Sequence, residues 1–200
     1  MGPQSESGSP AERAILSIMA ELAADGESIT IGDDPTCGGG DPACRGGVYV
    51  LRLAVGAPLL VRFGGYAGGR AIAVPAGECL YAGSALGARG AVALAGRLLR
   101  HATRTGGRPA HAIREPLQAR LAAAGLVAPL PAGKTLHWHI DYLLDEADVA
   151  MTGVAAIRTT ARLEGMLVER LLAQPGIVPL APGLGGSDDR GRSHLLARGQ

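Results

Sequence analysis

Aromatic residues are scarce in this chain of 200 residues, at 3% of the total, and lysine occurs only once, as Lys134. Apolar residues nevertheless make up 47% of the chain, which is enough for the hydrophobic core of one domain of ordinary size. That core must be built mainly from Ala, Leu, Val and Ile. Positive charge is carried almost entirely by arginine.

Long apolar runs and cysteines are also sparse. No apolar run approaches the roughly 20 residues that a bilayer span needs, and the N-terminus lacks the basic region and apolar stretch of an export signal. The three cysteines, Cys37, Cys44 and Cys79, are an odd number, and without an export signal they favour a reducing compartment. We therefore expect a cytoplasmic protein with no membrane partner.

Acidic and basic residues are separated along the chain, although the net charge is only +1. Residues 1–43 hold eight acidic residues against one arginine. Residues 89–120 hold seven arginines against one glutamate. This asymmetry indicates a local anionic partner rather than a generally basic surface.

Hydrophobic periodicity divides the chain into an acidic arm, residues 1–43, and a domain, residues 44–200. The arm is predicted to form one amphipathic helix over 9–24, which must pack on the domain or on a protein partner, and then a linker over 26–46. Strands of the domain are predicted at 47–55, 59–63, 71–74, 78–83 and 135–144. Its helices are predicted at 91–103, 117–124 and 160–173, with an excursion at 105–135 and an irregular stretch at 175–200.

Two tyrosines on predicted strands, Tyr49 and Tyr81, and a basic run on the next predicted helix form the first candidate site. The basic run lies on one face of that helix, at i, i+3, i+4 and i+7: Arg97, Arg100, His101 and Arg104. A phenol can handle a proton and a guanidinium can hold phosphate oxygens, which suits hydrolysis of a phosphodiester. A polar stripe opposite leucines is also typical of any surface helix, so spacing alone leaves both interpretations open.

The order and spacing of these residues resemble the GIY-YIG nuclease superfamily. Gly47-Val48-Tyr49 resembles its first tripeptide, and Tyr81-Ala82-Gly83 resembles the second. Arg97 and His101 match the Arg-x-x-x-His of the helix that follows. The superfamily uses a glutamate of a later helix as a metal ligand, for which Glu164 is the matching residue and Glu169 the alternative.

The resemblance implies a metal-dependent endonuclease that acts on DNA. Glu164 would hold Mg²⁺ or Mn²⁺. Tyr49 would orient or deprotonate the attacking water, and Arg97 would clamp the scissile phosphate while its charge favours the phenolate form of Tyr49. Tyr81 and His101 would complete the hydrogen-bond network. Three arginines would contact the nucleic acid: Arg89, Arg100 and Arg104.

A second candidate site lies in the segment 137–142, which reads His-Trp-His-Ile-Asp-Tyr. On a strand, His137, His139 and Asp141 would point to one face. Two imidazoles and a carboxylate can chelate a transition metal. A solvated or hydrogen-bonded strand face is the alternative interpretation.

This segment also resembles a branch of the superfamily whose members occur alone or fused to endonuclease III-type glycosylases. The resemblance extends over about residues 47–197 and implies a role in DNA repair. It adds four residues to the candidate site: His139, Asp141, Asp188 and His194. Gly165 stands where members of that branch carry a cysteine.

We therefore expect an α+β fold with a small mixed, largely antiparallel sheet flanked by the helices at 91–103 and 160–173. The site is expected on the sheet face beside the first of these helices. Two alternatives to a nuclease stay open. One is a nucleic-acid-binding module without catalysis, and the other is a transition-metal hydrolase built on His137, His139 and Asp141.

Overall fold

The structure is a computed structural model that describes residues 28–33, 44–186 and 191–199. The predicted helix over 9–24, most of the acidic arm and Asp188 lie outside these residues. Among the described residues, no helix is both long and apolar enough to cross a membrane.

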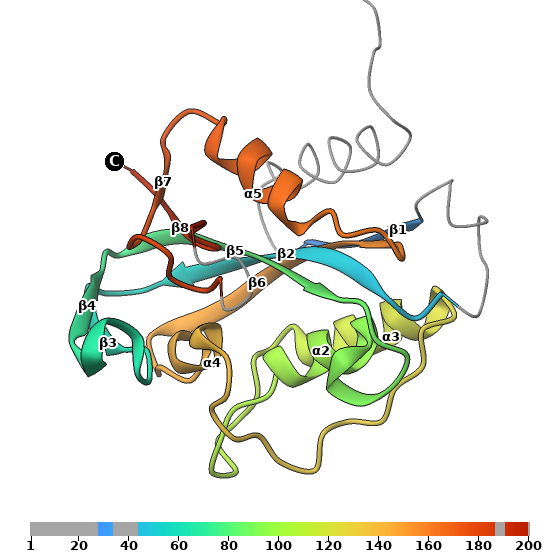
Figure 1. Ribbon diagram of the computed structural model, residues 1–200. Helices are drawn as coiled ribbons and strands as arrows, with labels where there is room; N and C mark the ends of the chain where they lie inside the picture. The colour runs from blue at the N-terminus through green and yellow to red at the C-terminus, as the bar shows by residue number, and fades with distance from the viewer. Residues whose placement is uncertain (1–27, 34–43, 187–190, 200) are drawn as a thin grey trace, which may run out of the picture.

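The centre of the fold is a six-stranded sheet with the strand order β1-β6-β2-β5-β8-β7 (Figure 1). The strands are β1 Ser28–Asp33, β2 Gly47–Val55, β5 Gly77–Ala85, β6 Val149–Arg158, β7 Ile177–Pro179 and β8 Leu195–Arg198. Only β1 and β6 pair in parallel, and every other pair is antiparallel. A separate hairpin pairs β3 Leu59–Arg62 with β4 Ala71–Val74. The predicted α+β fold with a mixed, largely antiparallel sheet is confirmed.

Helices cover both faces of the sheet (Figure 1). One face carries α2 Leu94–His101, α3 Arg114–Ala123 and α4 His139–Leu144, and the other carries α5 Glu164–Leu172. Side chains of β2 alternate between the two: Val48 and Val50 pack with α5, whereas Tyr49 and Leu51 pack with the three-helix face. Because both sides of β2 are covered, its first seven residues are all buried.

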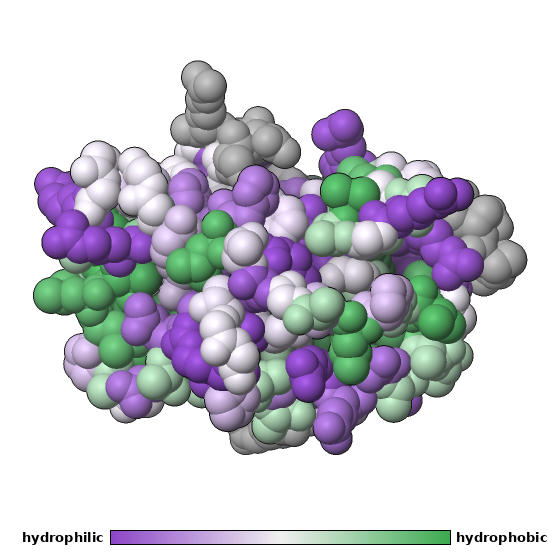
Figure 2. Space-filling model, turned by 90° about the horizontal axis from the view of Figure 1, so that it is seen from below, coloured by the Kyte–Doolittle hydropathy of each residue, from purple (hydrophilic) through white to green (hydrophobic). Residues whose placement is uncertain are grey.

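The face with α2, α3 and α4 presents a mixed surface to solvent (Figure 2). Polar and apolar side chains alternate in small patches over this face, and exposed apolar residues occur both on the β3–β4 hairpin, where Leu60 is 75% exposed, and near α3, where Val127 is 76% exposed. The apolar residues of this side therefore lie mainly beneath the helices, in the larger of the two buried clusters.

The predicted strand over 135–144 is wrong, because most of it is the helix α4. Asp141 stabilises the N-terminus of this helix: its carboxylate accepts hydrogen bonds from the backbone amides of His137 and Trp138, both at 3.0 Å. A carboxylate in the first turn satisfies amides that an α-helix leaves without partners. The alternating pattern of this segment therefore does not describe a strand.

Four strands were missing from the prediction. β1 lies within the stretch expected to be linker, so residues 28–33 belong to the sheet of the domain. The central strand β6 falls between predicted elements, and β7 and β8 lie in the stretch expected to be irregular. β6 is buried over most of its length, so it lacks the alternation of polar and apolar residues that marks a half-exposed strand.

Candidate active site

A cleft of about 500 Å³ opens at one edge of β5. β8 pairs with Cys79–Tyr81 of β5, and no other described strand covers the rest of that edge. Residues from both faces of the sheet can therefore meet there. The cleft is lined by Tyr81, Ser84, Leu86, Arg97, Trp138, Arg162, Glu164, Gly165, Met166, Glu169, Gly185, Arg192 and His194.

Glu164, the first residue of α5, places its carboxylate in this cleft. Ser84 of β5 donates a hydrogen bond to one carboxylate oxygen, and His194 Nδ1 lies 2.6 Å from the other. Burial acts to raise the pKa of Glu164, but the contacts with His194 and Ser84 and the charge of Arg97 together hold that pKa below its usual value. The carboxylate is therefore ionised near neutral pH, with 28% of the side chain exposed.

Arg97 reaches the cleft from α2 and is held in place on two sides. Its Nε donates a hydrogen bond of 2.6 Å to the carbonyl oxygen of Ala91, and its guanidinium lies 3.6 Å above the centre of the Trp138 ring. Such a cation–π contact stabilises a fixed guanidinium orientation. Trp138 is thus a positioning residue for Arg97.

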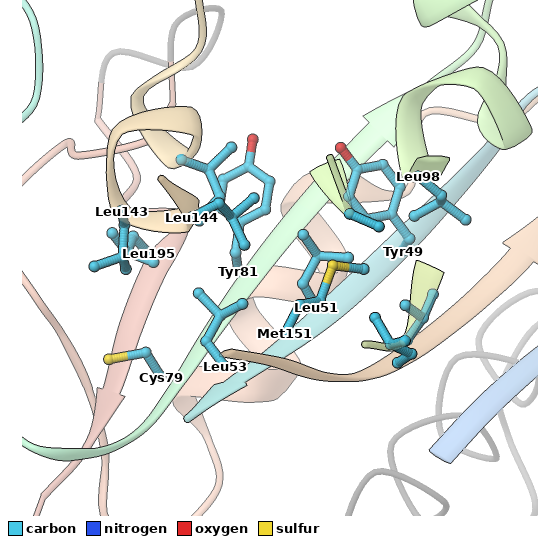
Figure 3. Close-up of a cluster of buried hydrophobic side chains, with 14 of the residues drawn as sticks. Tyr49, Leu51, Leu53, Cys79, Tyr81, Leu98, Leu143, Leu144, Met151 and Leu195 are labelled. Carbon is cyan, nitrogen blue, oxygen red and sulfur yellow. The ribbon is translucent and has the colours of Figure 1, made fainter. Parts of the chain in front are cut away.

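The two tyrosines rise from neighbouring strands on the same face of the sheet, with their hydroxyls directed to the same side (Figure 3). Their ring centres are 6.3 Å apart. Tyr81 lines the cleft, whereas Tyr49 is 1% exposed and lies behind it. A Cβ atom at Gly83 would come within 2.6 Å of the Tyr49 hydroxyl, so glycine is required where the two strands pair at that point.

Tyr49, His101 and Asp141 form a buried chain of polar groups behind the cleft. The Tyr49 hydroxyl is 2.9 Å from His101 Nε2, and His101 Nδ1 is 3.6 Å from Asp141 Oδ1. Burial lowers the pKa of His101 to about 4, so the imidazole is neutral at pH 7. With its proton on Nδ1 toward Asp141, the imidazole accepts the hydrogen bond of the Tyr49 hydroxyl through Nε2.

The expected phenolate at Tyr49 does not agree with this environment. Burial raises the pKa of Tyr49 well above its usual value, and Tyr81 adds to that rise, while the charge of Arg97 opposes it only in part. The desolvation of a fully buried phenol outweighs one neighbouring cation. Tyr49 is therefore a neutral phenol that hydrogen-bonds to His101.

The arginines expected to contact nucleic acid lie in three different places. Arg100 donates a hydrogen bond of 2.9 Å to Asp141, and Arg104 donates hydrogen bonds to the carbonyl oxygens of Leu144 and Val149. Both guanidiniums hold α4 and the start of β6 against α2. Arg89 is exposed and lines a second hollow of about 480 Å³ together with Arg45.

The second candidate site is not brought together as expected, because its segment is helical. Asp141 is fully buried and lies 3.2 Å from Lys134 Nζ and 2.9 Å from Arg100. Burial acts to raise the pKa of Asp141, but the neighbouring His101 and the charge of Lys134 hold the pKa well below its usual range. His139 accepts a hydrogen bond of 3.2 Å from the amide of Gly185. Across the described part of the chain, no group of three or more His, Cys, Asp and Glu could hold a metal ion.

Four cleft residues with polar or aromatic side chains received no role from the sequence: Ser84, Trp138, Arg162 and Arg192. Ser84 directly follows the second tyrosine tripeptide. Ala82, two residues earlier on β5, faces α5. Because side chains alternate along a strand, the Ser84 side chain is expected on the same side, beside that helix. Arg192 Nη2 lies 2.6 Å from Glu169 Oε1, and Arg192 also occupies the space beside Gly165.

A divalent ion fits the donors of this cleft. Glu164 offers an ionised carboxylate beside the imidazole of His194, and the open space leaves room for water and phosphate oxygens. Ions such as Mg²⁺ keep several water ligands and need only one or two carboxylates from the protein. The absence of a larger ligand cluster among the described residues therefore does not conflict with such a site.

Comparison with known proteins assigns the chain to a family. Residues 48–200 match the family described as domain of unknown function DUF123. This match covers more than half of the chain, and the protein belongs to that family. No curated protein and no solved structure matches the chain.

Proposed function

We propose that the protein is a metal-dependent endonuclease that hydrolyses phosphodiester bonds in DNA, with a role in repair in a reducing, cytoplasmic setting. The observation that carries the proposal is the meeting of Tyr81, Arg97 and Glu164 in one cleft. These residues come from β5, α2 and α5, on both faces of the sheet. A phenol, a guanidinium and a carboxylate at one open edge provide the groups that phosphodiester hydrolysis needs.

Arg97 binds the scissile phosphate in this mechanism. The guanidinium is pre-oriented by Trp138 and by the carbonyl of Ala91, so little rotational freedom is lost when phosphate binds. As the attacking oxygen approaches phosphorus, negative charge grows on the phosphate oxygens. A fixed guanidinium stabilises that charge more than it stabilises the ground state.

Tyr81 orients the attacking water, because its ring lines the cleft. Tyr49 lies behind the cleft and is held there by its hydrogen bond with His101. Neutral His101 accepts a hydrogen bond from the Tyr49 hydroxyl, so this phenol keeps its proton. This division reverses the expected order of importance of the two tyrosines.

Glu164 is the residue that would hold a divalent ion, Mg²⁺ or Mn²⁺. When bound, the ion would stabilise the leaving oxygen and the charge that develops on phosphate. The hydrogen bond from Ser84 fixes the carboxylate so that its orientation does not depend on the ion. Arg162 and Arg192 line the same cleft and are exposed, which suits contacts with flanking phosphates.

The direct test is incubation of the protein with nicked, flapped and branched DNA in the presence of Mg²⁺ or Mn²⁺. We expect cleavage that depends on the ion and that a chelator abolishes. Arg97→Ala should abolish cleavage while DNA binding persists, and Arg70→Ala, at an exposed arginine outside the cleft lining, should behave as wild type.

The alternative of a binding module makes a different prediction in the same experiment. DNA would be bound in a salt-sensitive way, with no cleavage by any of the three proteins. That result would contradict the proposed nuclease.

A further inference from the structure

His194 is a buried imidazole in the wall of the cleft. The residue is only 3% exposed. Its Nδ1 lies 2.6 Å from Glu164 Oε1, yet within the described parts of the chain neither Nδ1 nor Nε2 has a hydrogen-bond partner. A buried polar atom without a partner carries a free-energy cost and is often explained by an ion or a function.

The backbone on either side holds this imidazole in place before any ligand arrives. The His194 amide donates a hydrogen bond of 2.9 Å to Leu184, and its carbonyl accepts one of 3.0 Å from Ala82 of β5. Gly185 has a φ of +91°, and a Cβ atom there would come within 3.1 Å of the His194 Cβ and within 3.3 Å of Tyr81 Cε2. These contacts fix the backbone of His194, and a side chain at position 185 would crowd both His194 and Tyr81.

We propose that His194 is a metal ligand and that it binds one divalent ion together with Glu164. This inference rests on the proposed nuclease function, because the ion is the one that the cleft would use. Neighbouring ligands of an octahedral ion lie about 3 Å apart, close to the 2.6 Å that separates the imidazole nitrogen from the carboxylate oxygen. A small outward shift of either side chain would admit the ion between them.

The ligand pair also determines which ion is preferred. Imidazole suits first-row transition ions, whereas Mg²⁺ favours an all-oxygen shell. A carboxylate–imidazole pair therefore selects Mn²⁺, or a similar transition ion, over Mg²⁺. Ser84 completes the arrangement by holding the second carboxylate oxygen of Glu164, which leaves the first to share the ion with His194.

The test is electron spin-echo spectroscopy of Mn²⁺ added to the full chain, with DNA absent. A ligated histidine couples its ¹⁴N nucleus to the Mn²⁺ spin, and carboxylate and water ligands do not. We expect ¹⁴N coupling in the wild type and its loss in His194→Gln. Binding of Mn²⁺ should weaken about tenfold or more in that variant, and binding of Mg²⁺ should change less. His137→Gln, at an exposed histidine outside the cleft lining, is the matched control and should keep the coupling.

Three results would overturn the inference. Mn²⁺ bound through Glu164 without ¹⁴N coupling would show that His194 only hydrogen-bonds to the carboxylate, and the nuclease proposal would be unaffected. Coupling that persists in His194→Gln would assign it to another nitrogen. Absence of bound Mn²⁺ in the wild type would overturn the inference, and together with absent cleavage it would overturn the nuclease as well. If His194→Gln does not fold, loss of the same coupling in Glu164→Gln tests the shared site.

Discussion

At the scale of single residues, the cleft depends on contacts that fix a few side chains before substrate arrives. Gly83 is glycine because the Tyr49 phenol occupies the space of a Cβ atom. Tyr49, Arg97 and Glu164 could be singled out from the sequence, because their order resembles a known motif. Trp138 could not, because its contact with Arg97 joins α2 to a residue 41 positions later in the chain.

Trp138 provides a prediction at this scale. Trp138→Ala removes the ring beneath the Arg97 guanidinium, a contact that contributes about 1–2 kcal/mol when partly desolvated. We expect single-turnover cleavage to slow by roughly fivefold to thirtyfold, with a smaller change in DNA affinity. Trp138→Phe keeps an aromatic face and should restore most of the rate.

The cleavage rate and the DNA affinity of each variant should be measured in parallel. A loss of Arg97 positioning lowers mainly the rate, whereas a general loss of structure lowers both. Melting temperatures show whether each variant is folded. A wild-type cleavage rate in a folded Trp138→Ala protein would contradict the role given to this ring.

At the scale of elements, local pattern predicted the strands that turn residues mark at both ends, and it missed β1, β6, β7 and β8. The bounds predicted for β2 and β4 agree with the structure, because Gly and Pro mark their ends. β6 has no alternation to read, since helices and neighbouring strands bury it. α4 was misread because its helical state depends on Asp141, whose partners Arg100 and Lys134 lie outside the segment.

The role of Asp141 in α4 can be tested by stability. Asp141→Asn removes the charge that faces Arg100 and the buried Lys134. Breaking a buried ion pair from one side costs about 3–5 kcal/mol, so the free energy of unfolding in urea should fall by that amount. Asp148→Asn, at an exposed aspartate, is the matched control. Equal stability of the two variants would show that Asp141 does not hold this region together.

At the scale of the whole molecule, the cleft exists because β8 stops short along β5. Glu164 from one face and Arg97 from the other can then reach the same edge. The sequence predicted both helices, but not β8, so it could not show that His194 lies beside Glu164. The position of a sheet edge depends on long-range pairing, which no local pattern contains.

The buried histidines make the stability of the whole molecule depend on pH. Burial lowers the pKa of both His101 and His111 to about 4, below the usual value of 6.5. Between these values the unfolded chain binds protons that the folded protein does not bind. The contribution of each histidine to the free energy of unfolding is therefore fully present above pH 6.5. It is lost as the pH is lowered toward 4, which reduces the free energy of unfolding by about 3 kcal/mol for each histidine.

Urea unfolding at several pH values between 7 and 4 measures this dependence. His111→Gln should show a shallower decline, because one of the two histidines is removed at a site outside the cleft. A decline of the same steepness in wild type and His111→Gln would contradict the buried, neutral state of His111.

The most direct measurement of the central claim is single-turnover cleavage of branched DNA by wild type, Glu164→Gln and Glu169→Gln in Mn²⁺. Both glutamates line the cleft, but only Glu164 carries the contacts with Ser84 and His194. We predict that Glu164→Gln binds DNA and does not cleave it, whereas Glu169→Gln still cleaves. Unchanged cleavage by Glu164→Gln, or cleavage by none of the three proteins, would contradict a nuclease site at this carboxylate.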